Sequence, residues 1–437
     1  MDEFLLTGVF LLVLFFLLGS GVWVGLSLLG VALTGMVLFT TRPAGDAMVT
    51  TIWTASSSWT LTALPLFIWM GEILFRTRLS EDLFKGLAPW MMNLPGRLLH
   101  VNVAGCALFA AISGSSAATV ATVGKMSIPE LRRRNYPERM IIGTLAGAGT
   151  LGLLIPPSII LIVYGVTVNE SIAKLFIAGI LPGLLLAGLF MGFIMVTAIL
   201  KPDEMPPKGE SLSFGRKLRL SLNLVPVIAL ILAVLGSIYA GVATATEAAV
   251  LGVVGALLLS AVQGSLNRVT FRESLMGATR TSCMIALILA GSAFLSLSMG
   301  FTGLPRALAG WIAAQELSPL VLILALTVFY IVLGCFLDGI SSVVLTMAVV
   351  EPMVRQAGID LIWFGIFIVV VVEMAQITPP IGFNLFVLQG MTRHQITYIA
   401  RAALPMFFIM CLAVACLIAV PEIATFLPEQ MAQRPGG

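Results

Sequence analysis

Two short polar stretches interrupt apolar sequence in the first half of the chain, and their groups could bind an ion. They are Ser113-Gly-Ser-Ser116 and Pro156-Pro157. Serine hydroxyls and free backbone carbonyls are hard oxygen ligands that suit Na+, and a helix end directs N–H groups toward an anion. Proline removes a backbone donor and breaks a helix, which frees carbonyls such as that of Gly152. The alternative is close packing of small residues beside a simple kink.

Both stretches recur in the second half of the chain at a nearly constant offset. Asp338-Gly-Ile-Ser-Ser342 contains a second Ser-Ser pair, and Ile377-Thr-Pro-Pro380 contains a second Pro-Pro pair. Four landmark pairs keep their order and are 221 to 226 residues apart: Trp90 and Trp311, Ser116 and Ser342, Pro156 and Pro379, and Pro182 and Pro405. This order indicates a duplication. Paired, broken elements at membrane depth are typical of the binding site of a transporter.

Acidic residues lie close to these polar stretches. Asp338 could ligate a cation, relay a proton, orient the second stretch or cap its turn, because a carboxylate at membrane depth is usually functional. Glu247 follows Thr244 at the expected start of a helix, which favours capping. Glu373 lies near the second Pro-Pro pair, and its role is left open.

The two candidate cation sites differ in their side chains. Thr378 adds a hydroxyl at the second break, where the first break has Ile155. Asn384 follows the second break by about one helical turn. It could face a substrate or make an interhelical hydrogen bond.

Composition gives the fold class. Hydrophobic residues make up 59% of the 437 residues and charged residues 10%, against roughly 25% charged residues in soluble domains. We therefore predict an all-α polytopic membrane protein, without the alternating pattern of a barrel. The five cysteines are interpreted as small core residues. Motifs for catalysis or ATP binding are lacking, so we expect transport coupled to an ion gradient, no enzymatic activity and no nucleic-acid partner.

Ten apolar segments are predicted to span the bilayer. They are 4–18, 22–40, 61–75, 140–166, 173–200, 220–239, 244–263, 279–299, 362–389 and 402–420. The first is expected to be a retained span, since a basic region and a cleavage site are lacking. Residues 45–59 and their counterpart 268–277 are predicted to be interfacial arm helices.

Basic residues give an orientation. They cluster at Arg76–Arg97, Lys125–Arg139, Lys201–Arg219, Arg268–Arg280 and Arg393–Arg401, which the positive-inside rule places in the cytoplasm. Residues 101–123 have basic sequence on both sides, so they are predicted to form a re-entrant hairpin opening to the cytoplasm. Residues 320–350 should form a second hairpin opening to the other side. Five spans per half then invert the second half and place both termini in the periplasm.

The predicted organisation is therefore an inverted repeat. The first repeat covers 1–200, with the hairpin at 101–123 and a broken helix at 156–157. A cytoplasmic linker covers 201–219. The second repeat covers 220–425, with the hairpin at 320–350 and a broken helix at 379–380, and a tail covers 426–437.

Several motifs together resemble a known family. They are Phe109-Ala-Ala-Ile-Ser-Gly-Ser-Ser-Ala-Ala-Thr-Val120, the segment Gly149–Ile159, Thr246-Glu-Ala-Ala249, the segment Gly358–Gly365, and Ile377-Thr-Pro-Pro-Ile-Gly382. The chain resembles, over nearly its whole length, the large membrane subunit of tripartite ATP-independent periplasmic (TRAP) transporters.

The resemblance implies a multi-pass protein of the bacterial inner membrane that imports a small organic acid, such as sialic acid or a C4-dicarboxylate. It implies Na+ coupling with at least two sites, an elevator mechanism, a periplasmic substrate-binding protein and a small four-helix membrane subunit. That subunit is expected to be a separate chain, because Met1 starts at the large-subunit pattern. The fold implied is that of an elevator-type transporter similar to the ion transporter superfamily.

The resemblance also assigns roles by position. One Na+ site would involve Ser113, Ser115, Ser116, Gly152 and Pro156, and the other Gly334, Asp338, Ser341, Thr378 and Gly382. The substrate would meet Ser116, Ser342, Asp338 and Asn384. Pro156, Pro157, Pro379 and Pro380 would be hinges. The alternatives are a stand-alone Na+/dicarboxylate symporter and, from a different class, an intramembrane enzyme or a scaffold.

Overall fold

The computed structural model describes residues 3–77, 79–207, 212–303, 310, 318–380 and 382–432, and all their regular structure is helical. Five of these helices are long and apolar enough to cross a membrane, or seven if each of two bent helix pairs is one span, judged by length and composition. Each of the ten predicted spans falls on one helix or on a run of consecutive helices. The prediction of an all-α polytopic protein is confirmed.

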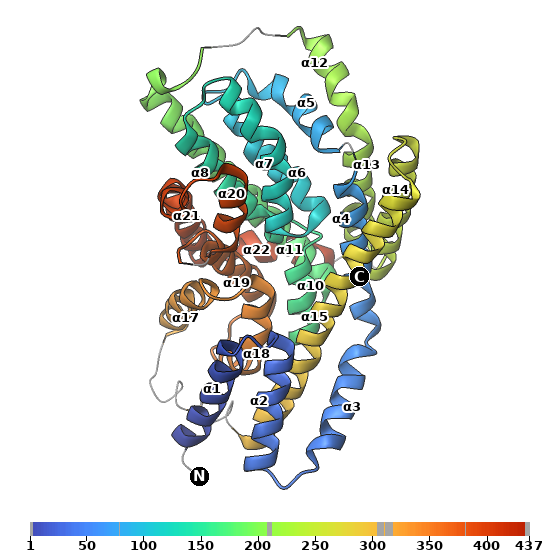
Figure 1. Ribbon diagram of the computed structural model, residues 1–437, viewed down its shortest axis with the longest axis vertical. Helices are drawn as coiled ribbons and strands as arrows, with labels where there is room; N and C mark the ends of the chain where they lie inside the picture. Colours follow the sequence, from blue (N-terminus) through green and yellow to red (C-terminus); the bar gives the residue numbers. More distant parts are fainter. Residues whose placement is uncertain are drawn as a thin grey trace.

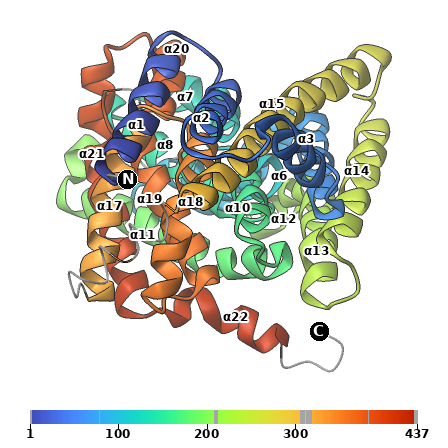
Figure 2. The same cartoon turned by 90° about the horizontal axis from the view of Figure 1, so that it is seen from below.

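One group of helices reaches from the N-terminal end of the molecule to one of its sides (Figures 1 and 2). Its members are α1 (Glu3–Gly19), α2 (Val24–Phe39), α3 (Ala44–Ser56), η1 (Trp59–Thr62), α4 (Ala63–Phe75), α13 (Val225–Tyr239), α14 (Ala245–Val262) and α15 (Arg268–Thr302). They pack in sequence from α1 through α2, α15 and α4 to α14 and α13, and the last two lie on that side. Glu247 closes a capping box with Thr244 at the start of α14, so the capping interpretation of this residue is confirmed. We call this group the flank.

The second group contains both polar stretches. In the first half it comprises α6 (Leu99–Ser113), α7 (Ser116–Arg133), α8 (Glu138–Gly149), α9 (Leu151–Leu154) and α10 (Ile159–Val168). In the second half it comprises α17 (Pro319–Gly334), α18 (Gly339–Gln356), α19 (Leu361–Gln376) and α20 (Phe383–Thr392). We call this group the hairpin body. The long helices α11 (Ile172–Leu200) and α21 (Ile396–Ala419) pack on it.

Helix ends in the hairpin body are specified locally. Gly114 adopts a left-handed conformation after α6, with φ 58°, which glycine tolerates without a steric penalty. Ser115, Ser158 and Asp338 cap α7, α10 and α18 through their side chains. Short polar residues of this kind satisfy the free N–H groups of a first helical turn. The polar stretches therefore end one helix and begin the next.

The two halves pack on each other reciprocally. In the hairpin body, α7 contacts α20, and α18 contacts α10. In the flank, α2 contacts α15, and α14 contacts α4. Figure 1 places α6 and α7 toward the end that carries α5 (Leu79–Met91) and α12 (Phe214–Ser221), and α18 toward the end with the N-terminus. A two-fold relation between repeats would produce this arrangement. The repeat boundaries and the periplasmic termini stay predictions.

The structure differs from the predicted boundaries at several places. Residues 268–277 are continuous with the following span in the 35-residue helix α15, so the prediction of a separate second arm helix was wrong. Its counterpart is a separate helix, because α3 meets the segment Trp59–Phe75 at a bend of 56°. The predicted linker ends inside α12, which follows η2 (Pro202–Glu204) and leads through η3 (Leu222–Leu224) into α13. The apolar residues of α12 repeat with helical spacing, and this signal was missed.

The predicted tail also begins within a helix, because α22 covers Glu422–Ala432 and packs against α11 and α19. Figure 2 shows α22 lying along the outer edge of the molecule near the C-terminus. The amphipathic α5 was not predicted. Trp311, one of the four landmarks, and Ile381, in the second break, lie outside the described residues.

Candidate functional site

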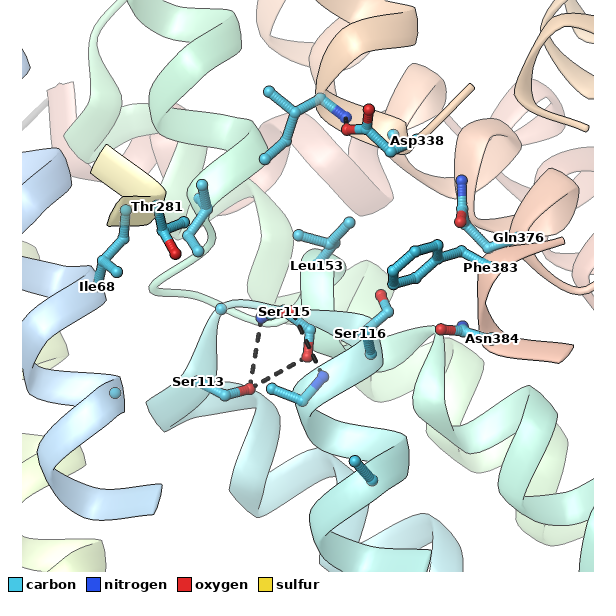
Figure 3. A pocket seen from close by; sticks show the side chains of 18 of the residues that line it. Ile68, Ser113, Ser115, Ser116, Leu153, Thr281, Asp338, Gln376, Phe383 and Asn384 are labelled. Atoms are coloured by element: carbon cyan, nitrogen blue, oxygen red, sulfur yellow. Dashed lines mark hydrogen bonds between the residues drawn. The ribbon is translucent and has the colours of Figure 1, made fainter. Parts of the chain in front are cut away.

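A cavity of about 480 Å³ lies where the two polar stretches meet the flank. Ser113, Gly114, Ser115 and Ser116 line it from the first half, and Asp338, Gly339 and Ile340 line it from the second. The flank contributes residues of α4 and α15, including Glu72 and Thr281. Figure 3 shows the labelled side chains around this space. Both hairpin tips therefore border one cavity.

The first tip is tightly packed and internally bonded. Thr119 Oγ1 donates to the Ser115 carbonyl at 2.8 Å and lies 2.9 Å from Ser113 Oγ. A Cβ at Gly71 on α4 would lie 3.0 Å from the Ile112 carbonyl oxygen. A Cβ at Gly152 would lie 2.6 Å from the Ser115 carbonyl oxygen. Glycine at both positions thus lets backbone approach the tip from two sides.

The first break lies directly against this tip. Ile159 N–H donates to the Gly114 carbonyl at 3.5 Å, and a Cβ at Gly114 would lie 2.8 Å from the Pro157 carbonyl oxygen. Ser158 Oγ donates to the freed Leu153 carbonyl and accepts from Leu161 N–H at 3.4 Å. Pro156 and Pro157 are buried, and their peptide bond is cis. One serine therefore satisfies a carbonyl and an N–H at this break.

The second tip reaches both halves. Asp338 Oδ2 accepts from the N–H groups of Ile340 and Ser341 at 3.1 Å each. Asp338 therefore caps its turn, as one interpretation held, but its side chain is exposed beside the cavity and is not buried. A Cβ at Gly339 would lie 3.5 Å from side-chain atoms of Leu153 and Ile160 in the first half. At the end of α17, a Cβ at Gly334 would lie 2.6 Å from the methyl carbon of Ala375 on α19.

The second break is more open than the first. Pro379 and Pro380 are exposed, and their peptide bond is also cis. Thr378 Oγ1 donates to the Met374 carbonyl at 2.7 Å. The carbonyl oxygens of Gln376 and Thr378 converge on Gly382, at 2.6 and 2.8 Å from the position of an added Cβ. These carbonyls offer oxygen ligands on one side of the break.

Buried polar atoms without a hydrogen-bond partner are concentrated here. They are Ser341 Oγ, Ser342 Oγ, Glu373 Oε2, Gln376 Nε2, and both Oδ1 and Nδ2 of Asn384. Each such atom costs about 1–3 kcal/mol when it is left unpaired. The side chains of Glu373, Gln376 and Asn384 line one cavity, which indicates that a ligand, an ion or ordered water completes their bonds.

Glu373 connects the two halves. Ser116 Oγ donates to Glu373 Oε1 at 2.6 Å, and the glutamate side chain is buried in α19. Burying an ionised carboxylate costs on the order of several kcal/mol, whereas a hydrogen bond to a charged group returns about 1.5–3 kcal/mol. The Ser116 hydroxyl therefore offsets only part of that cost if Glu373 is ionised.

The cavity is lined by acidic residues. Glu72, Asp338 and Glu373 are among the residues that line it, and none of the described lining residues is a lysine, arginine or histidine. Glu72 forms an ion pair with Arg76, and Arg76 also lies 3.6 Å from Glu273. A carboxylate ligand in this space would meet like charge unless cations accompanied it.

The sequence-predicted residues fall into two sets around this cavity. Ser113, Ser115, Ser116, Asp338 and Asn384 line the space itself. The other predicted residues lie outside its lining: Gly152, Pro156, Pro157, Gly334, Ser341, Ser342, Thr378, Pro379, Pro380 and Gly382. Glu373 and Gln376 were not assigned to the site, although an acidic residue inside an apolar span was a sufficient signal for Glu373. The ligand roles themselves stay predictions.

Groups of three or more His, Cys, Asp or Glu that could hold a metal ion do not occur among the described residues. The available oxygen ligands are instead hydroxyls, amides, carbonyls and single carboxylates. Such donors suit a weakly bound monovalent cation better than a transition metal.

Comparison with known proteins places the chain in a family. A family model described as the tripartite ATP-independent periplasmic transporter, DctM component, matches residues 11–423. The C4-dicarboxylate TRAP transporter large permease protein DctM of Pseudomonas aeruginosa is 33% identical over 378 residues, covering 86% of this chain and 87% of that protein. The sialic acid TRAP transporter large permease protein SiaM of Vibrio cholerae is 29% identical over 420 residues, covering 94% and 96%.

The fold is also found in a solved structure. The crystal structure of the Alcanivorax borkumensis YdaH transporter, described as having an unusual topology, matches with a TM-score of 0.66 at 15% identity. The match covers 93% of this chain and 98% of that one. Because the family model matches residues 11–423 and a relative is 33% identical, the chain belongs to the DctM-component family, the large permease subunits of tripartite ATP-independent periplasmic transporters.

Proposed function

We propose that this protein is the Na+-coupled membrane permease for a small organic acid. The observation that carries the proposal is the convergence of two hairpin tips on one acidic cavity with unpartnered polar atoms. Two cation sites are assigned, one at Ser113, Ser115, Ser116, Gly152 and Pro156, and one at Gly334, Asp338, Ser341, Thr378 and Gly382. Cations at these sites would offset the carboxylates of the cavity and permit an organic anion to enter.

The substrate is assigned to the cavity between the tips. The amide of Asn384 and the hydroxyl of Ser116 face it, and Figure 3 shows both side chains near the opening between the halves. The Asn384 amide can donate to a carboxylate, and the Ser116 hydroxyl can do so when it does not donate to Glu373. Relatives whose names include C4-dicarboxylate and sialic acid support an organic acid. Asp338 borders the same space, and the buried Ser342 follows it in the first turn of α18 and is assigned to the same substrate site.

The movement is assigned to the hairpin body, sliding as an elevator against the flank. The cavity lies at the boundary between these two groups, since α4 and α15 complete its wall. Contacts across the boundary include the Ser292 hydroxyl, which donates to the Val344 carbonyl at 2.8 Å. The hinges are Pro156, Pro157, Pro379 and Pro380. The partners proposed are a small four-helix membrane subunit and a periplasmic substrate-binding protein, in the bacterial inner membrane.

The experiment is uptake into proteoliposomes that contain this chain and the small subunit, with the binding protein added outside. We expect uptake of a radiolabelled organic acid only with an inward Na+ gradient and only with the binding protein. Uptake by this chain alone would instead support a stand-alone Na+/dicarboxylate symporter. Uptake that ignores the Na+ gradient would contradict the proposal.

A further inference from the structure

We propose that Glu373 forms a further Na+ site between the two hairpin tips, which shares Ser116 with the first of the two sites assigned above. This inference deepens the proposed function and rests on it. The residues that carry it are Glu373, Gln376 and Asn384 from the second half, with Ser116 from the first.

Glu373 is buried, and no described cation lies beside its carboxylate. Glu373 is 1% exposed and lies in the last turn of α19, after a run of buried apolar residues. Its only described partner is the Ser116 hydroxyl, on Oε1, and Oε2 is buried without a partner. A carboxylate in this position needs a compensating positive charge, because it is desolvated and lies at the negative end of the helix dipole. The described lining of the cavity contains no basic side chain that could supply it.

Buried polar side chains lie at the same cavity as Glu373. Asn384 is 1% exposed, and its Oδ1 has no partner. Gln376 is 4% exposed and follows Glu373 by three residues on the same helix, but its unpartnered atom is Nε2, a donor that does not bind a cation. All three side chains line the same cavity as Ser116. Figure 3 shows the Asn384 amide extending from α20 in the direction of Ser116.

The oxygen atoms of these side chains are ligands that suit Na+. A carboxylate oxygen, a serine oxygen and an amide oxygen are hard ligands, and water can complete the coordination of Na+ from the cavity. Mg2+ or Ca2+ would demand more carboxylates or a more rigid cage. Other acidic side chains at the cavity are already compensated, Glu72 by Arg76 and Asp338 by two backbone N–H groups. Glu373 is the acid that a single cation would satisfy.

The site has a consequence for coupling. Because Glu373 joins α19 to the tip of the first hairpin, a cation there would close the contact between the halves while the substrate is bound. One more Na+ would then accompany each substrate than the two hairpin sites account for.

The test is the ratio of Na+ to substrate, measured from the reversal potential of uptake in proteoliposomes holding the complete transporter. We expect Glu373→Gln to lower this ratio by one Na+ per substrate while uptake continues at a reduced rate. Glu247→Gln is the matched control, because that glutamate only caps α14, and its ratio should equal that of the unaltered protein. Tryptophan fluorescence with NaCl alone, without substrate, would show a correspondingly shallower titration in Glu373→Gln.

Three results would overturn the inference. An unchanged ratio in Glu373→Gln would mean that this residue only positions Ser116. If Glu373→Gln instead loses one H+ per substrate, so that the reversal potential depends on the pH gradient and the Na+ ratio is unchanged, Glu373 would bind a proton and not Na+. If Glu373→Gln fails to accumulate, Glu373→Asp should restore folding with a weaker Na+ affinity, and an unaltered Na+ affinity there would also contradict the site. Loss of Na+ dependence in the unaltered protein would instead contradict the proposed function.

Discussion

The two hairpins share a glycine and a Ser-Ser pair at their tips but have very different surroundings. The first is enclosed, with most of α6 buried and Pro156 and Pro157 buried behind its tip. The second is peripheral, since α17 exposes large apolar side chains along one side, among them Val328 at 63%, and its Pro-Pro pair is exposed. A motif that occurs twice in the sequence thus forms a buried junction in the first half and an exposed one in the second.

The difference arises from a few side chains at each break. Ser158 caps α10 and satisfies the Leu153 carbonyl in the first half. The corresponding helix α20 has Gly382 as its N-cap residue, so it lacks a capping side chain. The carbonyl oxygens of Gln376 and Thr378 lie close to Gly382. We infer that the first junction mainly holds structure and that the second leaves more of its oxygens available to a ligand.

The largest effect is expected from Gly152→Ala, which tests the buried junction. The new methyl group would lie 2.6 to 2.7 Å from backbone atoms of Ser115 and Ser116, so the tip must move. We expect a stability loss of about 1–3 kcal/mol and loss of Na+-dependent uptake, measured by thermal unfolding and by transport. Gly188→Ala, which has open space around it, is the control. Normal uptake by Gly152→Ala would show that the tip need not pack on the break.

The next effect compares the two serine pairs. Ser115→Ala with Ser116→Ala removes possible cation ligands and also the hydroxyl that binds Glu373. Ser341→Ala with Ser342→Ala removes hydroxyls that have no described partner. We expect both pairs to raise the Na+ concentration for half-maximal uptake, the first by roughly tenfold and the second by less. Normal expression with unchanged Na+ dependence in the first pair would count against the site at that tip.

Thr378→Val sharpens the comparison of the breaks. Removing its hydroxyl takes away the bond to the Met374 carbonyl and one possible ligand. We expect a roughly threefold shift in the Na+ titration of uptake, with little change in unfolding temperature. Ser158→Ala should do the opposite, lowering the unfolding temperature without shifting that titration. If the Thr378 variant titrates like the unaltered protein, the second site is misplaced.

The smallest effect is expected where the halves meet at the surface. Glu138 binds Arg132 within the first half, at 3.0 Å from Nε to Oε2, and contacts His394 Nε2 in the second half at 3.1 Å. These side chains are partly exposed, so the ion pair is worth about 0.2–1 kcal/mol. A double-mutant cycle with Glu138→Gln and His394→Gln, which measures the contact between the halves by chemical unfolding, should give a coupling in that range. A larger coupling would make this contact part of the buried junction.

Much of this architecture followed from the sequence because local rules and bilayer rules act residue by residue. Apolar run lengths located the helices of the ten predicted spans, glycine and proline located the tips and breaks, and Thr244 with Glu247 marked a helix start. The separate arm helix at 268–277 was wrong, and the predicted start of the tail at 426 lies inside α22. Polar residues within an apolar run do not determine whether a helix continues. Continuation of α15 is favoured by its packing along α2.

The tertiary structure alone decided which of these residues meet. Spacing along a helix does not tell which neighbour a side chain faces, so Glu373 had no assigned role until α19 was packed against the first tip. The contact between Ser116 and Glu373 joins residues 257 positions apart. Likewise, the two Pro-Pro pairs have the same sequence, but the first pair is buried and the second is exposed. Burial depends on the neighbouring helices and not on the motif. The sequence determined the broken, duplicated elements, and packing between the halves decided what each one surrounds.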